Sequence, residues 1–221
     1  MTTLHNDYFV CSVCSTKSMH TIVSSTNQFG SPDLDLRPPE MARSTIASWV
    51  QECPNCKYVS ESISDPLKVD ASFLSTKQYL ECDGMPFGDS SLEEVAKRFF
   101  RQYLLAQEQG DDRRALSALM HAAWICDDSR NDEAASACRL KAAAKATALI
   151  EQDESDKESL HLVRVDLYRR SGRFDEAIQA CSCISFSDET MEKVRLFELL
   201  RAQEEDRRCY TVAQAVTSLG E

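Results

Sequence analysis

The sequence contains no long hydrophobic run. None of its apolar stretches approaches the ~20 residues that a helix needs to cross a bilayer, so we expect no membrane span. Residues 1–10 also lack the basic stretch followed by an apolar one that is typical of a secretory signal. These two absences predict a cytoplasmic protein with no membrane partner.

Positive charge is in short supply. The 221 residues include 25 Lys and Arg against 36 Asp and Glu, which gives a formal net charge of -11. Nucleic-acid binding generally needs a surplus of basic side chains to displace counterions from phosphates, so the balance argues against a nucleic-acid partner. Three arginine pairs have carboxylates nearby in the sequence, and we interpret them as solvated helix surfaces. They are Arg113-Arg114, Arg169-Arg170 and Arg207-Arg208.

Catalytic motifs are also missing. The six glycines are too dispersed for a loop that cradles phosphates, and neither HExxH nor G-x-S-x-G occurs. We interpret two acidic pairs, Asp33 with Asp35 and Asp127 with Asp128, as solvated groups in loops and at helix ends. The sequence therefore predicts no catalytic residue, although it leaves open an enzyme of unrecognised type.

Cysteine, by contrast, is abundant and patterned. Ten are present, and four of them form the units CSVC and CPNC, separated by 38 residues. Two residues between cysteines let both thiolates point at one ion, and two such knuckles complete a tetrahedral shell of four sulfurs. Paired CxxC units in a reducing compartment are more often metal ligands than disulfides. We predict one metal ion, zinc, bound by Cys11, Cys14, Cys53 and Cys56.

A shell of four protein sulfurs leaves no position for water or substrate, so the predicted zinc is structural rather than catalytic. It would replace the core that a short segment cannot build alone. Iron in a rubredoxin-like knuckle is the competing metal, because a CP-x-C unit with Tyr8, Phe29 and Trp49 in the same region fits that interpretation as well.

The other cysteines and the histidines show no ligand spacing. Cys181 and Cys183 fall on a predicted helix, where their side chains diverge, and the remaining four cysteines are scattered. Buried cysteine behaves as a small apolar residue. His20 follows the first unit closely enough to supplement the metal site, but a surface role fits it better. We expect His121 and His161 to be packing or surface residues.

The pattern along the chain predicts three parts: a small metal module with strands at residues 1–65, a connector at 66–90, and a helical domain at 91–221. Within the module, residues 8–10 and 21–23 have strand composition. Residues 29–39 predict an irregular loop and 40–50 a short helix. The connector holds a short strand or helix over residues 68–80, and the sequence does not separate the two.

From residue 91, apolar residues recur every three or four positions, which predicts a succession of helices. Ser91 with Glu94, and Ser155 with Glu158, have the spacing of a capping box. The predicted helices begin near 91, 111, 131, 155, 173 and 188, and a short one follows near the end of the chain.

A spacing of glycine and alanine that occurs twice supports helical hairpins. Gly110 precedes Ala115 by five residues, and Gly172 precedes Ala177 by the same five. The glycine permits a tight turn, and the alanine lets two helices approach closely. The offset from residue 110 to 172 is close to two repeats of a ~34-residue helix hairpin.

Two stretches resemble a known bacterial family. FGSPDLD at 29–35, RPP at 37–39 and WVQECPNCKY at 49–58 resemble the domain of unknown function 2225 family. DLYRRSGRFDEAI at 166–178 is similar to that family's tail. The four cysteines coincide with the CxxC pairs of the family, but Lys57 stands where a glycine usually follows the last cysteine.

The second stretch also resembles a tetratricopeptide hairpin. Tyr168, Gly172 and Ala177 match its pattern, whereas Arg164 replaces a leucine, Cys181 replaces an aromatic residue, and no proline closes the unit. The array is therefore expected to be tetratricopeptide-like. The two resemblances imply an architecture and no established activity.

These observations predict an α+β protein, predominantly α, with a zinc-ribbon-like module before an antiparallel helical-hairpin array. Helical-hairpin arrays present concave surfaces to peptides and proteins. We therefore expect an adaptor or scaffold with a protein or peptide partner. The alternatives are an iron electron-transfer protein and an enzyme with a site between the two modules.

Overall fold

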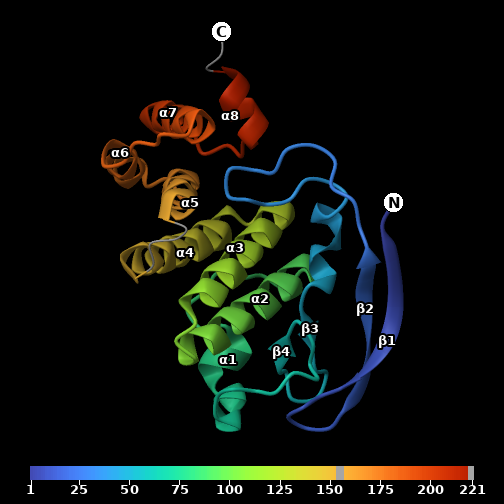
Figure 1. Ribbon diagram of the computed structural model, residues 1–221. Helices are drawn as coiled ribbons and strands as arrows, with labels where there is room; N and C mark the ends of the chain where they lie inside the picture. The colour runs from blue at the N-terminus through green and yellow to red at the C-terminus, as the bar shows by residue number, and fades with distance from the viewer. Residues whose placement is uncertain (153–156, 219–221) are drawn as a thin grey trace.

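The computed structural model describes residues 1–152 and 157–218 of the chain. Two small antiparallel sheets lie near the N-terminus, and a helical array follows them (Figure 1). This arrangement confirms the predicted α+β, predominantly α, fold class. Within the described ranges, no helix has both the length and the apolar character needed to cross a membrane.

The two sheets frame the two cysteine units. In the first, β1 (Thr3–Val10) pairs with β2 (Lys17–Ser25), and the first unit forms the turn between them. In the second, β3 (Gln51–Glu52) pairs with β4 (Val59–Ser60) around the second unit. The first two strands extend well beyond the segments 8–10 and 21–23 that composition indicated.

The remainder of the module and the connector contain short helical turns. A 3₁₀ helix, η1 (Arg43–Ser48), lies within the predicted helix 40–50. In the connector, η2 (Ala71–Ser75) and α1 (Lys77–Glu81) show that the undecided segment is helical rather than extended. The Thr76 hydroxyl begins α1 by accepting a hydrogen bond from the Tyr79 amide at 3.3 Å.

The helical array follows the predicted boundaries closely. Consecutive helices pack against one another along the chain, and α5 also contacts α7. The predicted capping box at Ser155 falls outside the described residues. The helices are α2 (Ser91–Glu108), α3 (Asp112–Ser129), α4 (Asp132–Gln152), α5 (Lys157–Arg170), α6 (Phe174–Ser182), α7 (Glu189–Gln203) and α8 (Val212–Ser218).

The capping box of α2 lies one residue earlier than predicted. The Ser90 hydroxyl accepts from the Glu93 amide at 3.2 Å, and the Glu93 carboxylate accepts in return from the Ser90 hydroxyl and amide. Glu93 also accepts a hydrogen bond from the Gly88 amide. Hydrogen bonds from Asn131 and from Gly88 and Ser90 hold the pKa of Glu93 at about 2. The tandem sequence SSLEE satisfies either spacing, and these extra donors select the first.

Four helices end in the same backbone motif. A residue with positive φ follows α2, α3, α5 and α7, at Gly110, Arg130, Gly172 and Glu205. At Gly110 the amide donates to the residue three before it, and the next amide donates to the residue five before itself. The other three ends repeat these bonds, which satisfy the last carbonyls of each helix. Gly110 and Gly172, the two glycines of the repeated Gly–Ala spacing, thus form two of these four helix ends.

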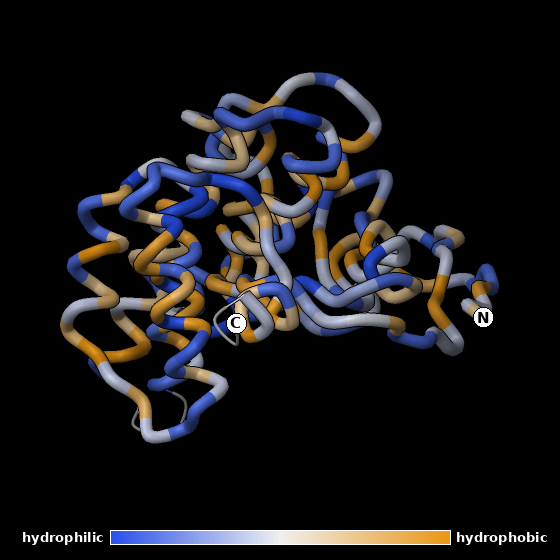
Figure 2. Tube along the Cα trace, turned by 90° about the horizontal axis from the view of Figure 1, so that it is seen from above, coloured by the Kyte–Doolittle hydropathy of each residue, from blue (hydrophilic) through white to orange (hydrophobic). Residues whose placement is uncertain are grey.

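One apolar core joins the module to the first helices. Cys11 and Cys53 belong to the same buried cluster as residues of α2, α3, α4 and α5. Hydrophobic and hydrophilic residues alternate along these helices in the view from above (Figure 2), as burying one face requires. The three-part division at residues 65 and 90 stays a prediction, and the core crosses both positions.

The loop that follows β2 reaches the far end of the array. Leu34 packs in a small cluster with residues of α7 and α8, and its amide donates to the Tyr210 carbonyl at 2.9 Å. The Val212 amide donates to the Pro32 carbonyl at the same distance. Figure 1 shows this loop passing over the ends of the central helices towards α8. The N-terminal segment therefore contacts both ends of the molecule.

Candidate metal centre

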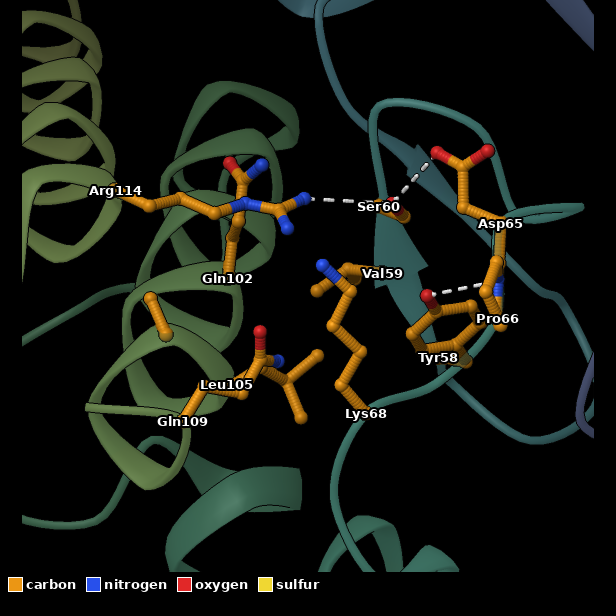
Figure 3. A pocket seen from close by; sticks show the side chains of 11 residues that line it. Tyr58, Val59, Ser60, Asp65, Pro66, Lys68, Gln102, Leu105, Gln109 and Arg114 are labelled. Carbon is orange, nitrogen blue, oxygen red and sulfur yellow. Dashed lines mark hydrogen bonds between the residues drawn. The ribbon is translucent and has the colours of Figure 1, made fainter. Parts of the chain in front are cut away.

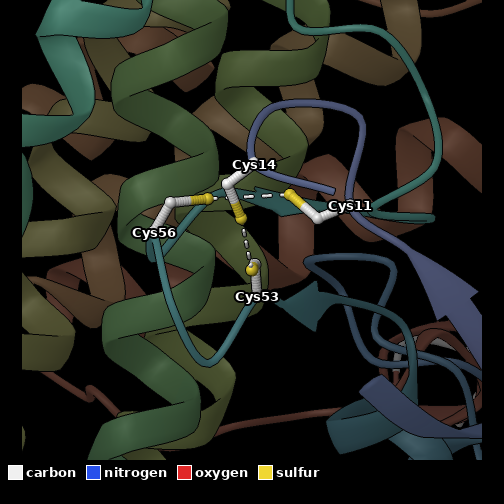
Figure 4. A group of neighbouring side chains, drawn as sticks. All are labelled: Cys11, Cys14, Cys53 and Cys56. Atoms are coloured by element: carbon white, nitrogen blue, oxygen red, sulfur yellow. Dashed lines mark hydrogen bonds between the residues drawn. The ribbon is translucent and has the colours of Figure 1, made fainter. Parts of the chain in front are cut away.

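The structure brings the four predicted cysteines together. Their sulfur atoms all lie within 4.8 Å of one another, although the two units are far apart in sequence. Cys11 Sγ is 3.6 Å from Cys56 Sγ, and Cys14 Sγ is 3.5 Å from Cys53 Sγ. Figure 4 shows the four side chains converging on one space from the two turns. Each unit thus contributes one sulfur to each close pair.

The two units have the same backbone geometry. In the first, the Cys11 amide donates to the Thr16 carbonyl, and the Ser15 amide donates to the Cys11 carbonyl. In the second, Cys53 makes the same two bonds, with Tyr58 and with Lys57. The residue after each second cysteine is left-handed, with φ of 60° at Ser15 and 62° at Lys57. This repetition orients all four sulfurs towards one point.

Lys57 has a positive φ, a conformation in which glycine would be the expected residue. An L-residue is strained in the left-handed region, whereas glycine adopts it readily. Lysine nevertheless keeps the same turn as its counterpart Ser15, so the knuckle geometry is retained. The Lys57 ammonium lies 3.2 Å from the Glu52 carboxylate. Lysine at this position therefore adds strain to the turn without displacing the sulfurs.

The sulfur spacing fits a tetrahedral metal shell. With metal–sulfur bonds of about 2.3 Å, the sulfurs of a tetrahedron lie about 3.8 Å apart. The observed close pairs at 3.5 and 3.6 Å and the upper limit of 4.8 Å bracket this value. Four thiolates are soft donors that suit zinc or iron. The four cysteines could thus bind one metal ion, and their geometry does not distinguish the metal.

The thiols sit in unequal environments. Cys11 and Cys53 are buried, whereas Cys14 and Cys56 are partly exposed. Desolvation raises the pKa of Cys11 and, more strongly, that of Cys56. Hydrogen bonding with the Thr16 side chain lowers the pKa of Cys14 to about 5. A cation at the centre would favour the thiolate at all four positions, so its binding would release protons.

The second knuckle is fastened to the helices by a set of polar contacts. Arg101 of α2 donates to Glu52 at 2.6 Å and to the carbonyls of Tyr79 and Leu80. The Tyr79 hydroxyl, in turn, donates to the Lys57 carbonyl at 2.8 Å. Arg101 and Tyr79 are both buried. Because these bonds join the second cysteine unit to α1 and α2, they fix the position of the candidate metal centre relative to the helical array.

The other residues considered from the sequence lie outside the centre. His20 contacts Ser18 and the ring of Phe9 rather than the sulfurs. His121 packs among aromatic rings, and burial lowers its pKa to about 4. His161 contacts Arg164. Of the six cysteines outside the centre, Cys183 and Cys209 are exposed and the others are buried.

Two acidic residues that we interpreted as solvated are buried. Asp33 and Asp35 are 3% and 1% exposed. Asp33 forms an ion pair with Arg43 at 2.6 Å. Asp35 accepts from Arg170 at 2.6 Å and from the indole nitrogen of Trp124 at 2.8 Å. The prediction was wrong because the partners of Asp35 come from the distant helices α3 and α5, while Asp33 is covered by Arg43 of the nearby η1.

Asp127 belongs to the same network. It accepts from both Arg139 and Arg170, and Arg170 bridges it to Asp35. Burial alone would raise the pKa of Asp127, but the two guanidinium groups outweigh it and hold the pKa below its usual value. Asp128, by contrast, is partly exposed and pairs with Arg37 at 2.6 Å.

The pair Arg169-Arg170 is likewise not a solvated helix surface. Arg169 is 0% exposed, and its guanidinium contacts Glu198 at 2.5 Å and Asp166 at 2.7 Å. Arg170 is 7% exposed. The pair Arg207-Arg208 is exposed as predicted, but it lies between α7 and α8 rather than on a helix. A buried guanidinium requires matched carboxylates, and the α5 arginines have them.

Comparison with family models, with curated proteins and with solved structures yields no match for this chain.

Proposed function

We propose that this protein binds one zinc ion through Cys11, Cys14, Cys53 and Cys56, and that the ion is structural. The observation that carries the proposal is the convergence of four sulfurs within 4.8 Å on two backbone turns of the same geometry. Four protein ligands complete a tetrahedral shell, which leaves no position for a substrate.

The role of the zinc centre follows from what it joins. It ties the turn of the β1–β2 hairpin to the turn between β3 and β4, and the second turn is fastened to α2 through Arg101. An isolated two-stranded hairpin is at best marginally stable in water. The ion would therefore hold the hairpin against the array in place of a larger apolar core.

We further propose that the helical array is the working surface of an adaptor with a protein or peptide partner. The support is architectural: helices pack in succession with repeated end motifs, as in tetratricopeptide-like arrays. On α7, Leu196 and Leu200 lie one turn apart and are 42% and 39% exposed. A cytoplasmic location and membership of the domain of unknown function 2225 family are parts of this proposal, and both rest on the sequence.

The metal proposal is tested by elemental analysis of the purified protein. We expect one zinc per chain and no visible absorption. One iron per chain, with a red colour that disappears on reduction, would instead support the electron-transfer alternative. Absence of either metal from protein purified under reducing conditions would contradict the proposed centre.

The adaptor proposal is tested separately, by affinity capture from the native host. A Leu196→Asp/Leu200→Asp variant should lose a partner that the native chain retains at matched abundance. Leu140→Asp is the control, because Leu140 has similar exposure but lies on α4. If both variants capture the same proteins as the native chain, α7 is not the docking surface.

A further inference from the structure

A cavity lies between the segment around the second cysteine unit and the helical array. It has a volume of about 210 Å³ and lies between β4, the segment that follows β4, and the helices α2 and α3. Figure 3 shows polar side chains entering it from both sides. Two of them are cationic, Lys68 from the module side and Arg114 from α3. Its apolar wall includes Val59 and Leu105, which are buried.

Arg114 is half-buried and lacks the carboxylate partners that the arginines of α5 have. Its Nε is buried and has no hydrogen-bond partner among residues 1–152 and 157–218, as is also true of the Nε of Arg170. Its Nη2 lies 3.5 Å from Ser60 Oγ, which is at the outer limit of a hydrogen bond. Across the same ranges it forms no ion pair, whereas Arg169 and Arg170 each pair with two carboxylates. An unmatched guanidinium is notable in a chain of net charge -11.

Gln102 is a second unsatisfied group in the same space. The residue is 6% exposed, and its amide makes no hydrogen bond within the part of the chain that the structure describes. Gln102 lines the cavity, so its amide can donate to a ligand there. Figure 3 shows Gln102 and Arg114 reaching the cavity from the helices. Two neighbouring polar groups thus have hydrogen-bonding capacity that the described residues leave unused.

Lys68 completes the set at the mouth of the cavity. Its side chain is exposed, extends towards the same space, and forms no ion pair with a described residue. An exposed lysine without a partner is ordinary by itself. Here it faces an arginine and an amide that are also without strong partners, so the three groups together present donors to one volume.

Asp65 does not pair directly with these cations, and its carboxylate leaves the two cations and one anion of the lining with a net charge of one positive unit. Asp65 lines the cavity, but its Oδ2 accepts only a long hydrogen bond of 3.4 Å from Ser60 Oγ. It forms no ion pair with Lys68 or Arg114, all three being described residues. Ser60 therefore lies between Asp65 and Arg114 with long contacts to both. The positive charge remains available to a ligand.

We propose that this cavity binds a small oxyanion, namely a carboxylate or phosphate group. Arg114 offers the planar donor geometry that matches two oxygens, Lys68 adds a point charge, and Gln102 donates from its amide. Val59 and Leu105 reduce contact with water along part of the wall, and a lower local polarity strengthens these interactions. The inference goes beyond the metal and adaptor proposals, because it depends on neither the identity of the metal nor a protein partner.

The test is isothermal titration calorimetry of the purified, metal-loaded protein with inorganic phosphate and, separately, with acetate at constant ionic strength. We expect saturable binding of at least one ion at one site per chain. Arg114→Gln and Lys68→Gln should each weaken it roughly tenfold to a hundredfold, as expected for hydrogen bonds to charged groups. Arg113→Gln, the adjacent arginine outside the cavity lining, should bind as the native chain does. The tighter of the two ions identifies the preferred oxyanion.

Two results would overturn the proposal: no saturable binding of either ion, or equal affinities in the native chain and both cavity variants. Far-ultraviolet circular dichroism checks that each variant folds. Lys68 is exposed, so Lys68→Gln should remain folded. If Arg114→Gln does not fold, the affinity of Lys68→Gln decides whether the proposal holds. As a second readout, the Gln102 side-chain amide should shift in nuclear magnetic resonance spectra on titration, and an unshifted signal would place the ion elsewhere.

Discussion

The N-terminal segment is anchored in two places by different chemistry. Around the cysteine units, two turns bring four thiols together, and these could bind one metal ion. In the loop after β2, Asp33 and Asp35 are held by Arg43 and Arg170 without any metal. The first anchor uses ligands at local spacing within each unit, whereas the second pairs residues as far as 135 positions apart. Both anchors add polar or thiol contacts to an apolar cluster, but only the first has a spacing that can be recognised in the sequence.

The largest expected effect breaks the cysteine anchor. Cys53→Ser removes a buried ligand, so the protein should lose its metal and several kcal/mol of stability, which corresponds to a fall in Tm of roughly 10 °C or more. Because the core crosses from the module into α2, the helices should be destabilised as well. Metal analysis and a thermal melt by circular dichroism measure both effects.

Cys183→Ser is the matched control, because Cys183 is an exposed thiol outside the centre. It should keep the metal and the native Tm. A Cys53→Ser variant that retains full metal content and Tm would show that the four-cysteine assignment is wrong.

The next effect breaks the ion-pair anchor. Arg170→Met leaves Asp35 buried without a cation, which should cost about 3–5 kcal/mol in urea denaturation. Arg208→Met tests the same chemistry at an exposed site, and should cost at most about 1 kcal/mol. Equal costs for the two variants would mean that burial of the α5 arginine has no energetic consequence.

A pH measurement compares the two anchors with His121, which is packed among aromatic rings. Burial lowers the pKa of His121 to about 4 in the folded chain, while its ordinary value is about 6.5. Between these values the unfolded chain binds the additional proton, so this contribution to stability is present above about pH 6.5 and is lost as the pH falls towards 4. His121→Phe should reduce the loss of stability between pH 7 and 4.5 by roughly 1–3 kcal/mol.

The control for this measurement is His5→Phe, on the exposed surface of β1. It should keep the pH dependence of the native chain, including any part due to metal loss. If His121→Phe and the native chain lose stability in parallel, His121 does not titrate as the structure indicates.

The smallest effect concerns strain within the second knuckle. Lys57→Gly relieves a φ of 62° but adds conformational entropy to the unfolded chain and removes a partly exposed ion pair with Glu52. The net gain should be at most about 1 kcal/mol in a chemical melt. Lys57→Ala, which cannot relieve the strain, should not be stabilising. A more stable alanine variant than glycine variant would contradict the strain assigned to this turn.

Local patterns predicted the helices and the cysteine centre well. The CSVC and CPNC units carry their geometry in the spacing itself, and apolar periodicity placed α2 to α4 within a few residues. The capping box was misplaced by one residue because SSLEE satisfies both registers, and Asn131, a distant donor, helps to select one. Arg130 ends α3 in the left-handed conformation without the glycine that marked Gly110.

Distant partnerships could not be predicted in this way. Arg169 and Arg170 look like any charged pair on a helix, and Asp33 and Asp35 like any acidic loop, until the fold brings them together. The cavity beside Arg114 was missed for the same reason, since its groups come from β4, the segment after it, α2 and α3. Groups whose chemistry is set by neighbours in the chain can be recognised in the sequence, whereas those set by neighbours in space cannot.

The central claim is that four cysteines form a closed zinc centre, and elemental analysis with a visible absorption spectrum tests it most directly. The account predicts one zinc per chain, no colour, and loss of the zinc in Cys53→Ser but not in Cys183→Ser. One iron per chain with a reducible red chromophore would contradict the identity of the metal. Metal-free protein, or zinc retained by Cys53→Ser, would contradict the centre itself.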